Sequence, residues 1–178
     1  MKFDHYRTPE IIVDSLLQSG FMNGAATLLE PCAGQGAIIE TVLKWHPETE
    51  VSACEILKQE FDILVNLPVA AKLGNFFDWK VYRRFDRVIC NPPFSNYHEF
   101  FRRCFELTND GGKLAFFIRT PMLSGKGHCE FYKEYKPSQI ILLSDRPCFL
   151  GNNYDISGYC WVIWDKPSTD HDTIVTWV

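Results

Sequence analysis

The sequence lacks the features of a membrane, secreted or metal-centred protein. No uninterrupted apolar run approaches the roughly 18 residues that a membrane-spanning helix needs. The first seven residues contain no apolar core of a signal peptide, and the seven cysteines include no Cys-x-x-Cys pair. The histidines do not fall at metal-ligand spacing from the cysteines. We therefore expect a cytoplasmic protein with no membrane partner, no disulfide framework and no metal.

An excess of positive charge is also missing. Eighteen Lys and Arg stand against 22 Asp and Glu, for a net charge of −4. This argues against a protein that coats nucleic acid as a polycation, but it leaves room for a local basic groove. With 46% apolar residues and no change of composition along the chain, residues 1–178 are expected to form a single domain.

Short apolar segments alternate with helical patterns along the chain. The first helix is expected after Thr8 as its cap and Pro9 as its first residue, and Gly20 ends it. Alternation of this kind predicts an α/β fold with a parallel sheet covered by helices on both faces. Ligands in such sheets bind beyond the carboxyl ends of the strands. The expected strands are residues 26–29, 51–54, 69–73, 85–90, 114–118, 138–143 and 158–164.

A glycine-bearing turn, residues 30–36, joins the first strand to the next helix. Glycine there lets a ligand approach the backbone closely, although such a turn can also be only a structural corner. Glu55 ends the second strand 19 residues after Gly36, the spacing at which an acid binds ribose in dinucleotide folds; the alternative is a solvated charge. Ile39 replaces the third glycine of Gly-x-Gly-x-x-Gly, so an adenosine ligand without pyrophosphate fits better than a nicotinamide cofactor.

Two further strand ends carry side chains suited to flat ligands. Asn75 can hydrogen-bond an adenine edge and Phe76 can cover its face, or both belong to the structural core. In Asn91-Pro92-Pro93-Phe94, the prolines fix a turn and remove two N–H donors. The Asn91 side-chain oxygen and a backbone carbonyl then offer two acceptors to a planar amino group, and Phe94 can stack on its ring. The alternative is a purely structural turn.

Together these motifs resemble the S-adenosylmethionine (SAM) dependent amino-methyltransferases, most closely the N6-adenine DNA methyltransferases. The resemblance covers about two thirds of the chain, with the N-terminal cofactor motif (residues 6–10) before the glycine motif and no target-recognition domain. It implies a Rossmann-like fold: a mostly parallel seven-stranded sheet, helices on both faces and an antiparallel C-terminal strand. Asn75 stands where the family usually has Asp.

The resemblance also implies the roles of individual residues. SAM would be the cofactor and S-adenosyl-L-homocysteine its product, with Thr8 and Glu30 at the methionine end and Glu55 at the ribose. The catalytic residues would be Asn91, Pro92, Pro93 and Phe94. The cofactor contacts would come from Tyr6, Thr8, Pro9, Glu30, Pro31, Cys32, Gly34, Gly36, Glu55, Ile56, Asn75 and Phe76.

The expected substrate is adenine in DNA, flipped out of the duplex and stacked on Phe94. Arg119 and Lys126, the latter in a loop expected to be flexible (residues 124–127), are candidate phosphate contacts. RNA methylated at guanine N2 or adenine N6, and protein glutamine, are alternatives, because the same turn suits planar amines in general. A non-catalytic SAM-binding subunit is another. The missing recognition domain leaves room for a homodimer or a partner subunit.

Overall fold

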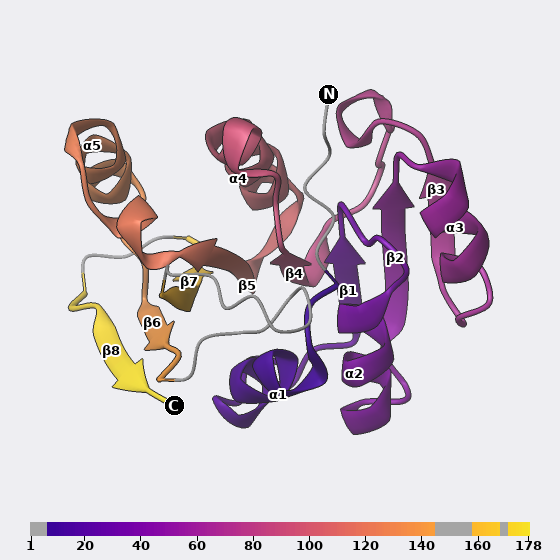
Figure 1. The fold of residues 1–178 in the computed structure, drawn as a ribbon, viewed down its shortest axis with the longest axis horizontal. Helices are drawn as coiled ribbons and strands as arrows, with labels where there is room; N and C mark the ends of the chain where they lie inside the picture. Colours follow the sequence, from indigo (N-terminus) through magenta and orange to yellow (C-terminus); the bar gives the residue numbers. More distant parts are fainter. Residues whose placement is uncertain (1–6, 145–157, 168–170) are drawn as a thin grey trace.

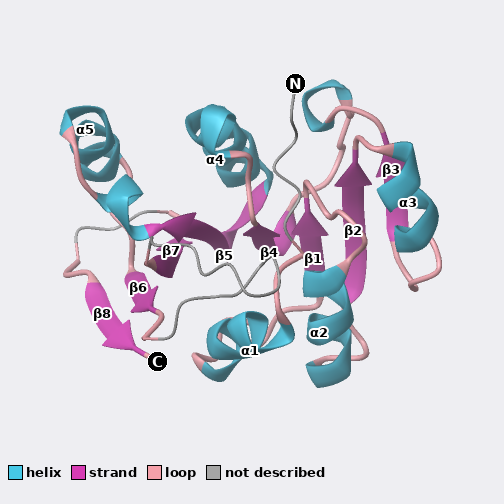
Figure 2. Cartoon of the chain, viewed as in Figure 1, coloured by secondary structure: helices cyan, strands magenta, loops and turns pink. Residues whose placement is uncertain are grey.

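The computed structural model describes residues 7–144, 158–167 and 171–178. Within these residues the chain forms an eight-stranded sheet with helices around it (Figure 1, Figure 2). The strands are β1 (Thr27–Glu30), β2 (Glu50–Glu55), β3 (Ala70–Leu73), β4 (Phe85–Cys90), β5 (Thr108–Arg119), β6 (Gln139–Leu142), β7 (Tyr159–Asp165) and β8 (Ile174–Trp177). The helices are α1 (Glu10–Gln18), α2 (Ala37–Trp45), α3 (Lys58–Leu64), α4 (Tyr97–Leu107) and α5 (Lys126–Glu134), with short 3-10 turns η1 (Phe76–Asp78), η2 (Phe94–Asn96) and η3 (Thr120–Leu123).

The strands lie in the order β3-β2-β1-β4-β5-β7-β6-β8. β1 to β5 pair in parallel, and β7 runs antiparallel to both β5 and β6. The expected mostly parallel sheet with an antiparallel C-terminal strand is confirmed. The expected strand number is wrong, because β8 adds an eighth strand that pairs in parallel with β6 at the sheet edge. β8 has only four residues and mostly exposed side chains, so its sequence carries little of the pattern that marks a strand.

Each face of the sheet has its own apolar core. One core joins the inward faces of α1, α2 and α3 to side chains such as Leu28 and Trp161. The other joins α4 and α5 to the opposite sheet face through residues such as Phe101 and Trp164. In Figure 1, α1 and α2 lie below the sheet, and α4 and α5 lie above it. Burial on both faces explains why the central strands read as continuous apolar runs.

The strand order reverses between β1 and β4. β2 and β3 lie on one side of β1, whereas β5 and the later strands lie beyond β4. In open α/β sheets, ligands bind in the crevice outside the carboxyl ends of the strands at such a switch point. Glu30 ends β1 and Cys90 ends β4, so the two expected motifs begin on either side of that crevice.

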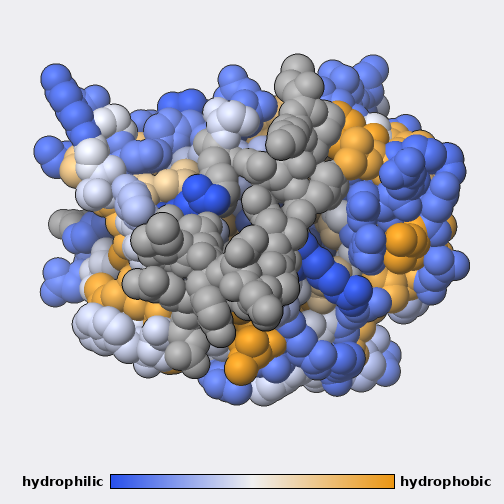
Figure 3. Space-filling view, in the orientation of Figure 1, coloured by the Kyte–Doolittle hydropathy of each residue, from blue (hydrophilic) through white to orange (hydrophobic). Residues whose placement is uncertain are grey.

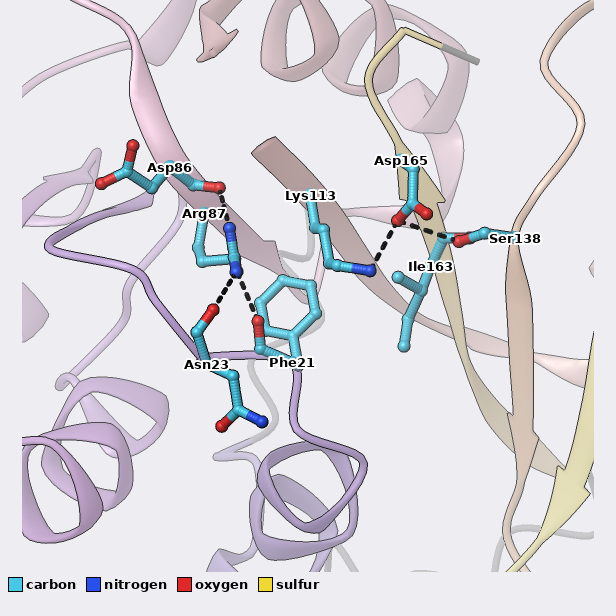
Figure 4. Close-up of polar contacts among 8 residues, drawn as sticks. All are labelled: Phe21, Asn23, Asp86, Arg87, Lys113, Ser138, Ile163 and Asp165. Carbon is cyan, nitrogen blue, oxygen red and sulfur yellow. Dashed lines mark hydrogen bonds and ion pairs between the residues drawn. The ribbon is translucent and has the colours of Figure 1, made fainter. Parts of the chain in front are cut away.

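A buried arginine ties the segment after α1 to the sheet (Figure 4). Arg87 on β4 is 6% exposed, and its guanidinium donates to the carbonyl oxygens of Phe21, Asn23 and its neighbour Asp86. Phe21 and Asn23 lie outside the helices and strands, so these bonds satisfy carbonyl groups of a connecting segment. They fix the turn between α1 and β1, and with it the start of the strand that leads into the glycine turn.

We expect Arg87→Met to lower the free energy of unfolding by about 2–4 kcal/mol, because buried carbonyls lose charged donors while the apolar stem is kept. Urea denaturation followed by circular dichroism measures the change. Arg84→Met, three residues earlier and exposed, is the matched control and should change stability by less than about 0.5 kcal/mol. Equal stabilities of the two variants would contradict this account of Arg87.

The surface seen in Figure 3 is mostly hydrophilic, with apolar patches around α3. Ile63 and Val65, at the end of that helix, are 46% and 48% exposed. Among the described residues, no helix is both long enough and apolar enough to cross a membrane.

Candidate active site

The glycine turn after β1 has a backbone that only glycine adopts readily. Gly34 and Gly36 have φ angles of 54° and 88°. A Cβ on Gly36 would lie 2.5 Å from the Cδ1 atom of Leu67, so a larger residue would also have to displace the end of that leucine side chain. The turn is closed by a bond from the Gly36 N–H to the Ala33 carbonyl, 2.8 Å long, and α2 starts directly after it.

Glu55, at the end of β2, holds this turn from the neighbouring strand. One carboxylate oxygen accepts from the Gly34 N–H and the other from the Leu57 N–H, both at 2.7 Å. The side chain is 4% exposed, so Glu55 is not a solvated charge. Each carboxylate oxygen still has a lone pair for a further donor. The neighbouring Ile56 is half exposed.

Glu30, at the end of β1, carries an unsatisfied buried carboxylate oxygen. It is 2% exposed, and its Oε2 atom has no hydrogen-bond partner among the described residues. Burial, together with the nearby Cys32 and Glu55, raises the pKa of Glu30 well above its usual value. A buried carboxyl in this state favours a cation or a donor placed beside it.

The turn after β4 meets the glycine turn at the switch point. The Cys32 thiol lies 3.2 Å from the Sγ atom of Cys90 and donates to the Asn91 carbonyl at 3.4 Å. The Asn91 amide donates from Nδ2 to the Thr8 hydroxyl at 3.2 Å. Pro92 is buried, whereas Pro93 is exposed. The structure thus brings three sequence-predicted segments together: the N-terminal motif, the glycine motif and the Asn-Pro-Pro turn.

Thr8 does not cap α1, contrary to expectation. Pro9 occupies the N-cap position, and no side-chain bond caps this helix. Thr8 is 5% exposed and its hydroxyl faces the Asn-Pro-Pro turn instead. The general preference for threonine before a helix gave the wrong role, because a tertiary contact 83 residues away competes for the same hydroxyl.

The two candidate residues in the segment after β3 lie in different environments. Asn75 is exposed, and its side-chain oxygen accepts from the Phe77 N–H at 3.1 Å, which caps η1. Phe76 is 3% exposed and stacks on Phe100 with a centroid distance of 5.6 Å. Phe76 is therefore a core residue, and Phe77, 37% exposed, is the more accessible ring.

The remaining candidates are less closely connected to this site. Tyr6 and the side chain of Phe94 lie outside the described part of the structure. Arg119 ends β5, and its Nε donates to the Tyr159 hydroxyl at 3.2 Å. Lys126 is exposed and is the first residue of α5, so it does not lie in the expected loop. Glycine on both sides of Lys126 suggested a loop, but the apolar face of α5 packs into the core and favours the helix.

A cavity beside the Asn-Pro-Pro turn was not predicted from the sequence. It has a volume of about 300 Å³, and His98 and His128 bring their ring centroids to 5.5 Å of each other there. Burial, and then the nearby His128 and Arg102, lower the pKa of His98. These two histidines are 30 residues apart, a spacing that carries no known signal. The cavity is lined by Ser95, Asn96, Tyr97, His98, Glu99 and His128. Among the described residues there is no cluster of three or more possible metal ligands.

No protein-family model matches the chain. Over 81 residues, 42% of this chain, it is 30% identical to the type II methyltransferase M.AccI of Acinetobacter calcoaceticus. The match spans only 15% of the length of that relative.

Solved structures are similar over most or all of the chain. A Listeria monocytogenes protein assigned as a class I SAM-dependent methyltransferase superposes with a TM-score of 0.76 and 14% identity, over 100% of this chain and 67% of its own. A Pyrococcus horikoshii protein assigned as an RNA methyltransferase gives a TM-score of 0.69 and 17% identity, over 92% and 88% of the two chains. The plantazolicin methyltransferase BpumL, solved with S-adenosylhomocysteine, gives 0.64 and 10%, over 88% and 85%.

The strand order, the helices on both faces and these superpositions define the fold. The chain has the Rossmann-like fold of the SAM-dependent methyltransferases. The resemblance drawn from the motifs is confirmed at this level, and the cofactor that it implies is the one named for these structural relatives.

Proposed function

We propose that the chain is a SAM-dependent methyltransferase that transfers a methyl group to the exocyclic amine of adenine in DNA. The observation that carries the proposal is the meeting of two turns at the switch point. One holds the buried carboxyl of Glu30, whose Oε2 atom has no partner among the described residues, and the other holds the Asn91 amide. The first suits a cationic ligand and the second suits a planar amine.

The residues present fit SAM. Its methionine end carries an ammonium group and its sulfur a positive charge, and Glu30 offers a buried acceptor with no other partner among the described residues. The open backbone at Gly34 lets the ligand approach, since a Cβ there would meet nothing within 4 Å. Glu55, fixed by two N–H donors, has lone pairs left for the ribose hydroxyls. Asn75, Ile56 and Phe77 are exposed near the end expected to hold the adenine.

SAM, when bound, supplies a methyl group that is already activated by the positive sulfur. The protein must therefore prepare the nitrogen, whose lone pair is delocalised into the base. The Oδ1 atom of Asn91 and the Pro92 carbonyl accept from the two amine hydrogens, which favours a pyramidal nitrogen with its lone pair directed outward. The rest of the acceleration comes from alignment of the two reactants.

DNA is favoured as substrate because the chain shares 30% identity over 81 residues with a type II methyltransferase. Flipping a base out of duplex DNA costs a few kcal/mol, and one aromatic stack returns about 1–3 kcal/mol. The Phe94 ring alone is therefore not sufficient, and phosphate contacts must contribute. Lys126, exposed at the first turn of α5, is the candidate we favour, with Arg119 as a second.

The test is methyl transfer from radiolabelled SAM to separate pools of unmethylated DNA, total RNA and protein. We expect label in DNA, recovered as N6-methyladenine after digestion and mass spectrometry. Label only in RNA or protein would overturn the DNA assignment. SAM binding by calorimetry without transfer to any pool would indicate the non-catalytic module, and absence of binding would overturn the proposal as a whole.

A further inference from the structure

We infer that Thr8 is a positioning residue for catalysis, whose hydroxyl holds the Asn91 amide in the orientation that methyl transfer needs. The inference rests on the proposed function, because it gives Asn91 its role. It comes from the 3.2 Å bond between Asn91 Nδ2 and Thr8 Oγ1, which joins residues 83 positions apart at the switch point.

The segment that carries Thr8 is fixed on both sides of it. Arg7 forms a 2.8 Å ion pair with Glu40 on α2, and Lys44 on the same helix pairs with Glu10 at 2.7 Å. Both pairs are largely exposed and each contributes little by itself.

A stronger anchor lies inside the core. The indole N–H of Trp161, which is fully buried on β7, donates to the Ile12 carbonyl at 2.8 Å. α1 is thereby fixed against the sheet. With Pro9 restricting the backbone that follows, Thr8 is held at the catalytic turn with 5% exposure.

Orientation matters because the two ends of an asparagine amide are similar in size and opposite in hydrogen bonding. With Nδ2 bound to Thr8, the Oδ1 atom occupies the other branch of the amide and is free to accept from the target amine. A half-turn about the amide would present an NH₂ group to another NH₂ group, and these two donors cannot bond. Methyl transfer therefore needs one of the two amide orientations.

A hydroxyl can both accept and donate, so a second contact must set its direction. The motif resemblance implies that Thr8 lies at the methionine end of SAM, which would offer an acceptor for its single proton. Its lone pairs then remain for Asn91 Nδ2. Cys32 fixes the backbone of the same residue by donating to the Asn91 carbonyl at 3.4 Å, so Asn91 is held through both its side chain and its main chain.

The experiment compares wild type, Thr8→Val and Thr8→Ser by steady-state kinetics with unmethylated plasmid DNA at saturating SAM. Valine keeps the shape but removes the acceptor, whereas serine keeps the hydroxyl. We expect Thr8→Val to lower kcat by about 3- to 10-fold, the loss of one modest hydrogen bond, with the KM for DNA changed less than about twofold. We expect Thr8→Ser to retain kcat within about twofold.

A matched control is Thr41→Val, which removes another buried hydroxyl, one that donates to the Ala37 carbonyl within α2. It should leave kcat unchanged. An active wild type with an equally active Thr8→Val overturns the inference alone. Recovery of the Thr8→Val rate at higher SAM also overturns it, because the hydroxyl would then serve only cofactor binding. A wild type that methylates neither DNA nor the RNA and protein pools overturns the proposed function, and this inference with it.

Discussion

Replacement of Asn91 by alanine is expected to abolish methyl transfer while SAM binding persists. The variant loses the Oδ1 acceptor that prepares the amine, and loss of one such preorganised group typically lowers kcat by about 100- to 1,000-fold. The carboxyls that suit the cofactor, Glu30 and Glu55, lie on other strands and keep their places. Radiolabel transfer measures the first effect, and isothermal titration with SAM measures the second.

Asn66→Ala is the matched control for this loss. Asn66 is exposed after α3, and its amide donates only to carbonyls of that helix among the contacts described. We expect this variant to transfer methyl groups at the wild-type rate. Undiminished turnover by Asn91→Ala would remove the catalytic role of this residue. Loss of SAM binding together with turnover would show instead that the variant has damaged the cofactor site.

The convergence of the motifs was predictable because parallel topology is itself readable from the sequence. Once apolar segments alternate with helices, every βα turn must lie at one edge of the sheet. Glu30, Glu55 and Asn91 follow three different strands, and the structure brings all three strand ends to that edge. No single motif was sufficient to predict the candidate site. The prediction depended on the common position of several strand ends at one edge of the sheet.

Contacts between distant segments were not predictable in this way. Thr8 appeared as a helix cap because its sequence neighbours suggest one, yet its partner is 83 residues away. Phe76 was a candidate ligand contact, but it stacks on Phe100 from α4, and nothing in the sequence near either ring indicates the pairing. The His98–His128 cavity likewise forms only where α4 and α5 pack together. Local patterns predict elements, whereas side-chain partners depend on how those elements pack.

Glu30→Gln is expected to weaken SAM binding and, at the same time, to stabilise the unliganded protein. Glutamine keeps the size of the side chain and removes its charge. The affinity for SAM should fall by about 10- to 100-fold, the contribution of a charged hydrogen bond. The unliganded protein should gain stability at neutral pH, because a buried carboxyl whose Oε2 atom has no partner in the described part of the chain is replaced by a neutral amide.

The stability difference between the wild type and Glu30→Gln should depend on pH in a defined direction. Burial raises the pKa of Glu30 in the folded protein above its value in the unfolded chain, where the usual value is 4.5. As pH rises above that value, the unfolded chain releases the proton first, so the folded state becomes progressively less favoured until Glu30 also ionises in it. Thermal melts should therefore show the wild type losing stability relative to Glu30→Gln as pH rises, and the two converging in acid.

Titration with SAM across the same pH range separates a ligand-binding carboxyl from a merely buried one. A cation binds the ionised form of Glu30, so wild-type affinity should increase with pH up to the raised pKa, while the affinity of Glu30→Gln stays level over that interval. Glu48→Gln, exposed before β2, serves as control and should follow the wild type in both measurements. If Glu30→Gln bound SAM as tightly as the wild type at every pH, the cationic end of the cofactor would have to lie elsewhere. The buried charge would then destabilise the fold without contributing to binding. If Glu30→Gln instead loses SAM affinity and gains stability, the destabilising carboxyl is retained because it binds the ligand.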